Sequence, residues 1–445
     1  MSYIANTTEQ RAEMLARCGV ESVDALFADI PEALRPPSFN LPPARTEFEV
    51  LRHLEGLAEH NYTHLTSFVG AGFYDHYIPA AVDALAGRSE FYTAYTPYQP
   101  EVSQGTLQAI YEYQTDICRL TGLDVSNASL YDGGTALYEA CQMALAATGR
   151  RRIVIDGGVN PIYRKMIYTY AANLSIEFAE IPVSHGQTDR DKLMAEVDGR
   201  TAGVILQNPN FFGVIDDHTD VTARCRERGV TTVQSVNPIA LAVLKTPAEQ
   251  GFDIATGEGQ PLGIPLSFGG PYLGFMAARR ELVRRMPGRI VGRTTDRLGR
   301  ECFVMTLQAR EQHIRREKAT SNICTNQALC ALRAHIYLSL LGAAGLREVA
   351  GLCRSRAHEL KQRLKALPCV SVLESSPTFH EFTVRLPIDA GEAVSRMIER
   401  GFAAGFPLGR YYPGMENYLL IAVTEKRSRC EMGLYAETLE DVICR

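Results

Sequence analysis

The feature that most constrains this fold is a regular alternation of short apolar runs with amphipathic helical segments through the middle of the chain. The apolar runs have the length of buried strands and recur at 153–155, 176–181, 204–206 and 230–236. Polar–apolar segments of helical period separate them, as at 161–172 and 217–228. Strands covered on both faces read as continuous apolar runs, and helices connect parallel strands. The pattern predicts an α/β fold with a mostly parallel sheet and a ligand site beyond the carboxyl ends of its strands.

The first 65 residues predict a helical arm. Thr7–Gln10 and Thr46–Glu49 match the capping boxes that begin helices, and Gly19 is suited to end the first helix. Five prolines between residues 31 and 43 keep the chain extended. An apolar stripe of helical spacing lies between the two helices, formed by Val23, Leu26, Phe27 and Ile30. Such a stripe needs a surface to pack on, so we expect the arm to clasp another surface.

The pattern changes again in the last third of the chain. A long helical stretch is predicted at 326–341 and 343–367. It leads to two predicted strands, at 380–385 and 418–423. Two predicted helices, at 390–400 and 429–442, flank these strands. We therefore expect three parts: an arm at 1–65, a large α/β domain at 66–330 and a small α+β domain at 331–445.

Composition excludes several classes of protein. Apolar residues make up 46% of the chain and charged residues 22%, as in a soluble globular protein. The net charge of -5, with both signs interspersed, argues against a nucleic-acid surface. No signal peptide is recognisable at the start, and no uninterrupted apolar stretch is long enough to span a bilayer.

Cysteine and histidine usage predicts neither a disulfide framework nor a metal site. The 11 cysteines lack CxxC pairs and regular spacing, which favours reduced thiols and a cytoplasmic location. The ten histidines show no HExxH motif, and His60 and His64, four residues apart, lack accompanying carboxylates. We therefore predict no metal.

A loop rich in tyrosine and proline at 91–101 is the densest functional candidate. It offers hydroxyl donors and flat ring faces just before the helix expected at 104–120. The alternative is a packing loop whose tyrosines cap the core. We favour function, because rigid loops before helices often carry binding residues, here Tyr95, Thr96, Tyr98 and Gln99.

A second candidate is the segment 308–325, in which cationic side chains precede hydroxyl and amide residues at the start of a predicted helix. Free amides and the helix dipole attract anions there, and arginine adds bidentate phosphate contacts. Ser321 and Asn322 are the candidate ligands. By pattern alone, a plain helix cap by Asn322 or Thr325 beside a solvated charged face explains the segment better.

A lysine is missing from the glycine-rich turn at 257–263. In chains with this organisation, that turn commonly presents the lysine that binds pyridoxal phosphate, because only an amine condenses reversibly with the cofactor aldehyde. Here the turn offers Gln260 and Pro261. Lys165 and Lys245 are conceivable substitutes, but both lie in contexts typical of solvated surface lysines.

Four segments together resemble the glycine decarboxylase P-protein of the glycine cleavage system. They are Thr66–Gly72, Glu90–Gly105 with its TAYTPYQPE run, Gln308–Ala328 with its TSNICT run, and Val423–Arg427. The resemblance covers essentially the whole chain and corresponds to the N-terminal half of the longer, single-chain enzyme. It implies the aspartate-aminotransferase-like fold (fold type I of the pyridoxal phosphate-dependent transferases).

The resemblance also implies partners. In the split form of this family the cofactor lysine lies on a second subunit, and the reaction uses glycine and the lipoyl group of H-protein. Active relatives place an aspartate against the pyridine nitrogen, where this chain has Asn237. A neutral amide does not stabilise a pyridinium as a carboxylate does. The missing lysine and the missing aspartate together predict a chain without catalytic residues of its own.

Three hypotheses follow. In the first, the chain is an essential subunit whose Tyr95, Thr96, Tyr98, Gln99, Ser321 and Asn322 complete the partner's cofactor site. In the second, it is a non-catalytic scaffold that stabilises the partner and docks H-protein. In the third, it is a self-sufficient enzyme with an unusual lysine such as Lys245.

Overall fold

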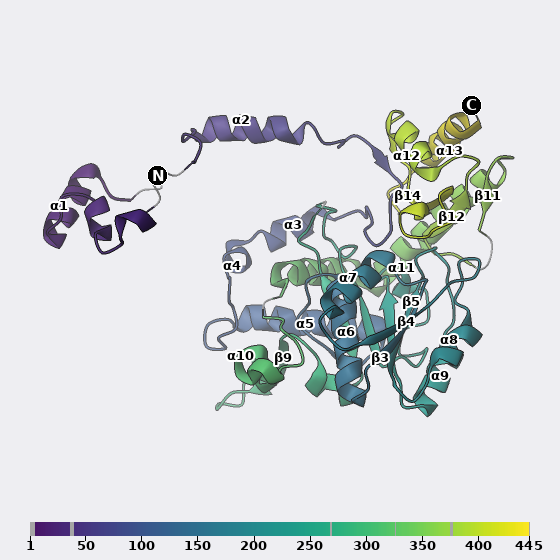
Figure 1. The fold of residues 1–445 in the computed structure, drawn as a ribbon. Coiled ribbons are helices and arrows are strands. Elements are labelled where there is room, and N and C mark those ends of the chain that lie inside the picture. The colour runs from purple at the N-terminus through teal and green to yellow at the C-terminus, as the bar shows by residue number, and fades with distance from the viewer. Residues whose placement is uncertain (1–4, 36–39, 268, 325, 374–376, 445) are drawn as a thin grey trace. The chain divides into compact units, whose positions relative to one another are not determined.

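The computed structural model describes residues 5–35, 40–267, 269–324, 326–373 and 377–444 (Figure 1). Contacts divide the chain into two compact units, 1–63 and 64–445. The three-part division expected from the sequence stays a prediction.

The first unit contains short helices whose capping residues are those the sequence predicts. Both expected capping boxes are present, at Thr7 and Thr46, and Gly19 ends the first helix with φ 71°. The apolar stripe at 23–30 forms only a short 3₁₀ helix. No described residue of this unit is buried. Its elements are α1 (Thr8–Cys18), η1 (Asp24–Phe27), η2 (Glu32–Leu34) and α2 (Glu47–Ala58).

The second unit is built on a seven-stranded sheet in the order β2-β8-β7-β6-β5-β3-β4. The pairs from β7 through β4 are parallel, whereas β8 runs antiparallel to both of its neighbours. The predicted mostly parallel sheet is confirmed. Its strands are β2 (Val125–Ser126), β3 (Arg152–Asp156), β4 (Glu177–Ile181), β5 (Thr201–Asn208), β6 (Thr231–Val236), β7 (Ile254–Glu258) and β8 (Gly274–Ala278).

Helices cover both faces of this sheet because successive strand residues point to opposite sides. Ile153 and Ile155 pack with α6 and α7, while Val154 packs with α8 and α9. The helices of this region are α3 (Ala80–Ala86), α4 (Ser89–Tyr92), α5 (Gln104–Thr121), α6 (Gly133–Thr148), α7 (Pro161–Ala171), α8 (Arg190–Glu196), α9 (Thr219–Glu227) and η3 (Ala240–Ala242).

A hairpin and several short turns follow the sheet and lead to the long helix α11. The hairpin strands pair antiparallel and pack beside α5. The elements are η4 (Arg280–Arg285), β9 (Ile290–Thr295), β10 (Glu301–Thr306), η5 (Gln308–Arg310), α10 (Gln312–Arg315), η6 (Arg316–Lys318) and α11 (Ala328–Lys365).

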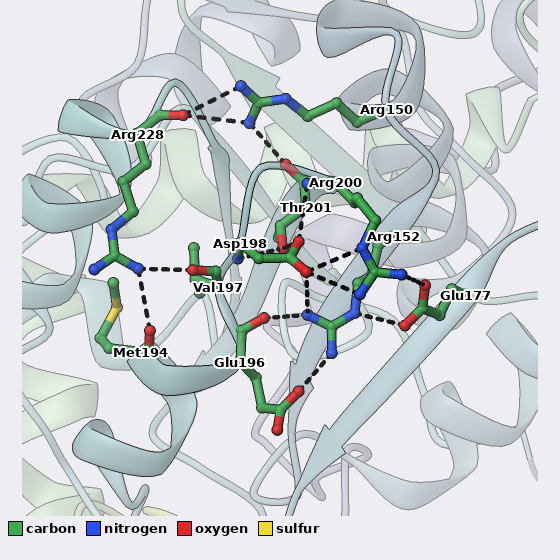
Figure 2. A network of polar contacts seen from close by, with 10 residues as sticks. All are labelled: Arg150, Arg152, Glu177, Met194, Glu196, Val197, Asp198, Arg200, Thr201 and Arg228. Carbon is green, nitrogen blue, oxygen red and sulfur yellow. Dashed lines mark hydrogen bonds and ion pairs between the residues drawn. The ribbon is translucent and has the colours of Figure 1, made fainter.

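An arginine network joins the amino-terminal ends of β3, β4 and β5 (Figure 2). In these parallel strands, those ends lie opposite the carboxyl ends, where the sequence predicts a ligand site. The largely buried Arg152 side chain contacts Glu177 at 2.8 Å and Glu196 at 2.5 Å. Arg150 donates to the Thr201 carbonyl at 2.9 Å. Buried charges are stable when they are paired and hydrogen-bonded in this way. The network therefore has a structural role, because it holds the amino-terminal ends of these strands together.

The C-terminal region is a four-stranded antiparallel sheet, β11-β12-β15-β14, with α12 and α13 packed on it. Segment 66–67 joins this region, because β1 pairs in parallel with β13. The elements are β1 (Thr66–Ser67), β11 (Ser371–Val372), β12 (Glu381–Arg385), α12 (Ala390–Ile398), β13 (Phe402–Ala403), β14 (Phe406–Pro407), η7 (Leu408–Arg410), β15 (Tyr418–Ala422) and α13 (Arg429–Cys444).

Two findings differ from the sequence-based expectations. By length and composition alone, α11 could cross a membrane, although Gly342 interrupts it with φ 58° and its apolar face packs into the cores of the sheet and the C-terminal region. Such a helix is weak evidence for a membrane span, since core helices have the same composition. Cys369 and Cys444 form a disulfide, so the expectation of reduced thiols fails for this pair.

Candidate functional site

A small polar cavity lies where the sequence predicts a ligand site, at the carboxyl ends of the parallel strands. Asn160 follows β3, Gln207 ends β5, Asn237 follows β6 and Glu258 ends β7. Tyr74, His380 and Glu381 close it from other parts of the unit. The cavity volume is only about 30 Å³.

Glu258 occupies the amino end of α6 within this site. Its carboxyl group accepts hydrogen bonds from the amides of Gly133 at 2.9 Å, Gln260 at 2.9 Å and Leu273 at 3.0 Å. Burial raises the pKa of Glu258 to about 8, against the opposing effect of these bonds. The first amides of a helix bind anions. Here the chain's own carboxyl group already occupies that position.

Gln260, in the turn where a cofactor lysine is expected in related chains, is buried and fully hydrogen-bonded. Its Oε1 accepts from the Tyr74 amide at 2.8 Å. Its Nε2 donates to the carbonyls of Tyr74 at 3.1 Å and Ile264 at 2.8 Å. The side chain therefore joins two backbone segments and has no nucleophilic nitrogen.

Asn237 is likewise engaged with the backbone. Its Oδ1 accepts from the amides of Ile239 at 2.9 Å and Ala240 at 3.1 Å, which caps the next turn. Its Nδ2 lies 3.5 Å from His380 Nε2. Burial lowers the pKa of His380 well below its ordinary value, so its imidazole is neutral. The strand end thus presents two neutral groups.

Glu381 closes the cavity from β12. Its carboxyl group accepts from the Ala71 amide and from Tyr74 Oη, both at 2.7 Å. Burial raises the pKa of Glu381 to about 7. These bonds hold segment 71–74 over the strand ends, and the cavity beneath it is only about 30 Å³.

Pyridoxal phosphate does not fit this site. Pockets for drug-sized ligands measure about 300–1,000 Å³, an order of magnitude more than the cavity found here. Even a Cβ atom at Gly133 would lie 2.7 Å from Tyr163 Oη. An amine and a carboxylate for the pyridine nitrogen are both missing at the expected positions, and Glu258 fills the anion position. No reaction step is derived through the cofactor in this cavity.

The lysines considered as substitutes are not among the residues that line the cavity. The Lys245 ammonium group pairs with Asp217 at 2.5 Å, and its side chain is 59% exposed. Lys165 lies on the exposed side of α7. Both have the solvated surroundings that the sequence suggested.

The tyrosine loop lines a separate cavity of about 490 Å³, which we call the tyrosine cavity. Tyr95 is 87% exposed. The Tyr98 hydroxyl donates to Asn326 Oδ1 at 3.3 Å, and the Arg289 guanidinium lies 3.9 Å from the centre of its ring. Thr96 also lines this cavity. The exposed Gln99 does not line it, and the Gln99 carbonyl accepts from the amides that follow it.

The second predicted group lies at another cavity of about 470 Å³, which we call the Glu139 cavity. Ser321 and Asn322 line it together with residues of α6 and α7. Ser321 Oγ accepts from the Ile323 amide at 3.1 Å, while Cys324 and Asn326 line the tyrosine cavity. The structure therefore places five of the six predicted residues at two openings, and Gln99 lines neither of them. Thr325 lies outside the described residues.

A buried cluster of His76, Cys353 and Glu425 has residue types that can bind metals, and it was missed from the sequence. Although burial raises the pKa of Glu425, hydrogen bonding to His76 lowers it overall, to about 2. Glu425 accepts from His76 Nδ1 at 2.7 Å, the Tyr77 amide at 2.6 Å and Cys353 Sγ at 3.3 Å. Each contact has a donor and an acceptor, so hydrogen bonding accounts for the contacts of Glu425, whereas the buried His76 Nε2 has no hydrogen-bond partner among the described residues. In the sequence, the only indication of this cluster was the segment Val423–Arg427, which is one of the four segments that carry the family resemblance.

The mostly parallel sheet, the small α+β region and the closed site at the strand ends define the class: an aspartate-aminotransferase-like fold, fold type I of the pyridoxal phosphate-dependent transferases. A glutamate decarboxylase from Lactobacillus brevis shares this fold, with a TM-score of 0.69 at 15% identity, over 94% of this chain and 97% of that one.

Sequence comparison gives the family. The profile of the glycine cleavage system P-protein matches residues 1–438. A probable glycine dehydrogenase (decarboxylating) subunit 1 from Geotalea uraniireducens is 55% identical over 443 residues, 100% of both chains. The crystal structure of an inhibitor-bound glycine decarboxylase (P-protein) has a TM-score of 0.94 at 42% identity, over 99% of this chain and 100% of that one. The chain belongs to the glycine cleavage system P-protein family, which confirms the resemblance.

Proposed function

We propose that this chain is the first subunit of a two-subunit, decarboxylating glycine dehydrogenase in the cytoplasm. The partner subunit holds pyridoxal phosphate covalently; the cofactor supplies an electron sink for the loss of carbon dioxide from glycine, and the aminomethyl group passes to the lipoyl group of H-protein. The observation that carries the proposal is Gln260, a buried and fully bonded amide at the position of the missing amine. Relatives named as subunit 1 of this enzyme support it.

The role proposed for this chain is to complete the partner's site at an interface between the two subunits. Tyr95 presents an exposed ring and hydroxyl group, whereas Tyr98 is held by Arg289 and Asn326. A tyrosine fixed by such contacts loses little further entropy when a ligand binds. Thr96 and Gln99 are proposed as neighbouring polar contacts.

Ser321 and Asn322 are proposed to donate to the phosphate of the partner's cofactor. Both lie outside the chain's own closed cavity, on a segment that faces an opening. A hydroxyl and an amide are suitable donors for phosphate oxygens. No nucleophile or general base is assigned to this chain.

Exchange of the glycine carboxyl group tests the shared site. The partner alone is expected to be nearly inactive, and adding this chain restores exchange. Tyr95→Phe and Asn322→Ala in this chain are expected to lower the exchange rate while assembly persists. Tyr77→Phe, an exposed tyrosine that lines neither cavity, is the control.

Full exchange by the partner alone would refute the proposal. If the complex needs this chain but both variants exchange at the wild-type rate, the chain is the scaffold of the second hypothesis. Borohydride reduction with the cofactor and peptide mapping address the third: a pyridoxyl group on Lys245 would make the chain self-sufficient.

A further inference from the structure

The Glu139 cavity contains a buried acid without a counterion. Glu139 lies on α6 with only 6% of its surface exposed, and its Oε2 has no hydrogen-bond partner. Glu139 lines the cavity. Buried polar atoms are rarely left unpaired, so the unpaired carboxyl oxygen of Glu139 indicates a missing hydrogen-bond donor.

The charge of this acid is incompletely compensated by its surroundings. Burial raises the pKa of Glu139 to about 7, and the Ser321 hydroxyl acts in the opposite direction. Among the described residues, no cation pairs with Glu139, and the other titratable groups lining the cavity are Tyr131, Tyr138 and Tyr170. A cation that enters would favour the ionised form of Glu139, because an opposite charge nearby lowers the pKa of a carboxyl group.

The walls also favour a cation. The rings of Tyr138 and Tyr170 have centroids 5.1 Å apart, and Tyr131 lines the same space. Aromatic faces attract ammonium and guanidinium groups, and arginine stacks on them while it binds a carboxylate. At the rim, Tyr170 is 52% exposed and Leu174 is 41% exposed. Exposed aromatic and apolar residues around a desolvated charge are characteristic of protein interfaces.

We propose that the Glu139 cavity receives a lysine or arginine side chain of the partner subunit, with its cationic group paired to Glu139 and flanked by the tyrosine rings. The inference rests on the proposed two-subunit function, because Ser321 and Asn322, which are proposed to face the partner, form one wall of the cavity. A partner side chain is favoured over a free small cation because Ser321 and Asn322, which line the cavity, are the residues proposed to contact the partner.

Calorimetric titration of the partner subunit into this chain tests the inference. Wild-type affinity is expected to rise with pH from 5.5 to 8, and association near pH 7 releases protons as Glu139 ionises. The Glu139→Gln chain is expected to bind at least tenfold more weakly at pH 8, with little pH dependence and less proton release. Tyr170→Ala, at the exposed rim, should weaken binding three- to tenfold without affecting the fold. Glu227→Gln, an exposed glutamate on α9, is the control.

Three results would overturn the inference. Glu139→Gln and Tyr170→Ala chains that bind with wild-type affinity and proton release would leave Glu139 as an ordinary protonated core acid. Binding of methylguanidinium to the isolated chain that depends on Glu139, with subunit affinity unchanged in the variant, would assign the cavity to a small cation. Failure of the wild-type chain to bind the partner would refute both this inference and the proposed function, whereas the first two results leave the function intact.

Discussion

Replacement of Glu258 by glutamine should change how stability depends on pH. The buried carboxyl group has a pKa of about 8 in the folded chain, compared with an ordinary value of 4.5. Between these values the folded chain holds a proton that the unfolded chain has released, so raising the pH favours unfolding. At about 1.4 kcal/mol per pKa unit, the full difference corresponds to roughly 5 kcal/mol. This stabilisation is complete below pH 4.5 and is lost as the pH rises through 8.

The Glu258→Gln chain cannot ionise at this position. Its amide oxygen can still accept from Gln260 and Leu273, but the amide nitrogen then faces the Gly133 amide, which loses its acceptor. An unsatisfied buried donor costs about 1–3 kcal/mol. We therefore expect the variant to be less stable than wild type at pH 5, and as stable or more stable at pH 8.5.

Urea denaturation from pH 5 to 9, followed by circular dichroism and tyrosine fluorescence, measures this difference. Coincidence of the two transitions establishes the two-state condition for the free energy. Glu381, with a pKa of about 7, titrates in both chains and cancels from the comparison. Glu227→Gln should follow wild type throughout. Parallel curves for wild type and Glu258→Gln would show that Glu258 does not carry a raised pKa, and the reasoning would fail.

Two further predictions concern the closed site and the small core. Introducing Gln260→Lys should not create a cofactor site, because the cavity holds only about 30 Å³ and Glu258 fills the anion position; a pyridoxyl group on residue 260 after borohydride reduction would contradict this. Replacing Phe382, fully buried in the C-terminal core, by alanine should cost about 3–5 kcal/mol of unfolding free energy. The exposed Leu434→Ala should change that free energy by less than about 0.5 kcal/mol, and equal effects would argue against this core.

Local patterns were sufficient to predict many elements of this fold, although helix α6 and the hairpin of β9 and β10 were not predicted. The period of apolar residues located strands such as 153–155, and capping residues Thr7 and Thr46 located helix starts. The absence of an amine at Gln260 was also visible without a structure. These features depend on residues a few positions apart, and hydrogen bonding within one turn or burial of one strand face sets them directly.

Contacts between distant segments could not be predicted in this way. Glu258 meets the amide of Gly133 across 125 residues, and Cys369 meets Cys444 across 75. The same packing separates Tyr95 from Ser321 and leaves Glu139 without a counterion. Burial, pKa and hydrogen-bond partners depend on which segments the folded chain brings together. No local period encodes that choice, so whether the site was open or closed became known only when the strands and helices were packed.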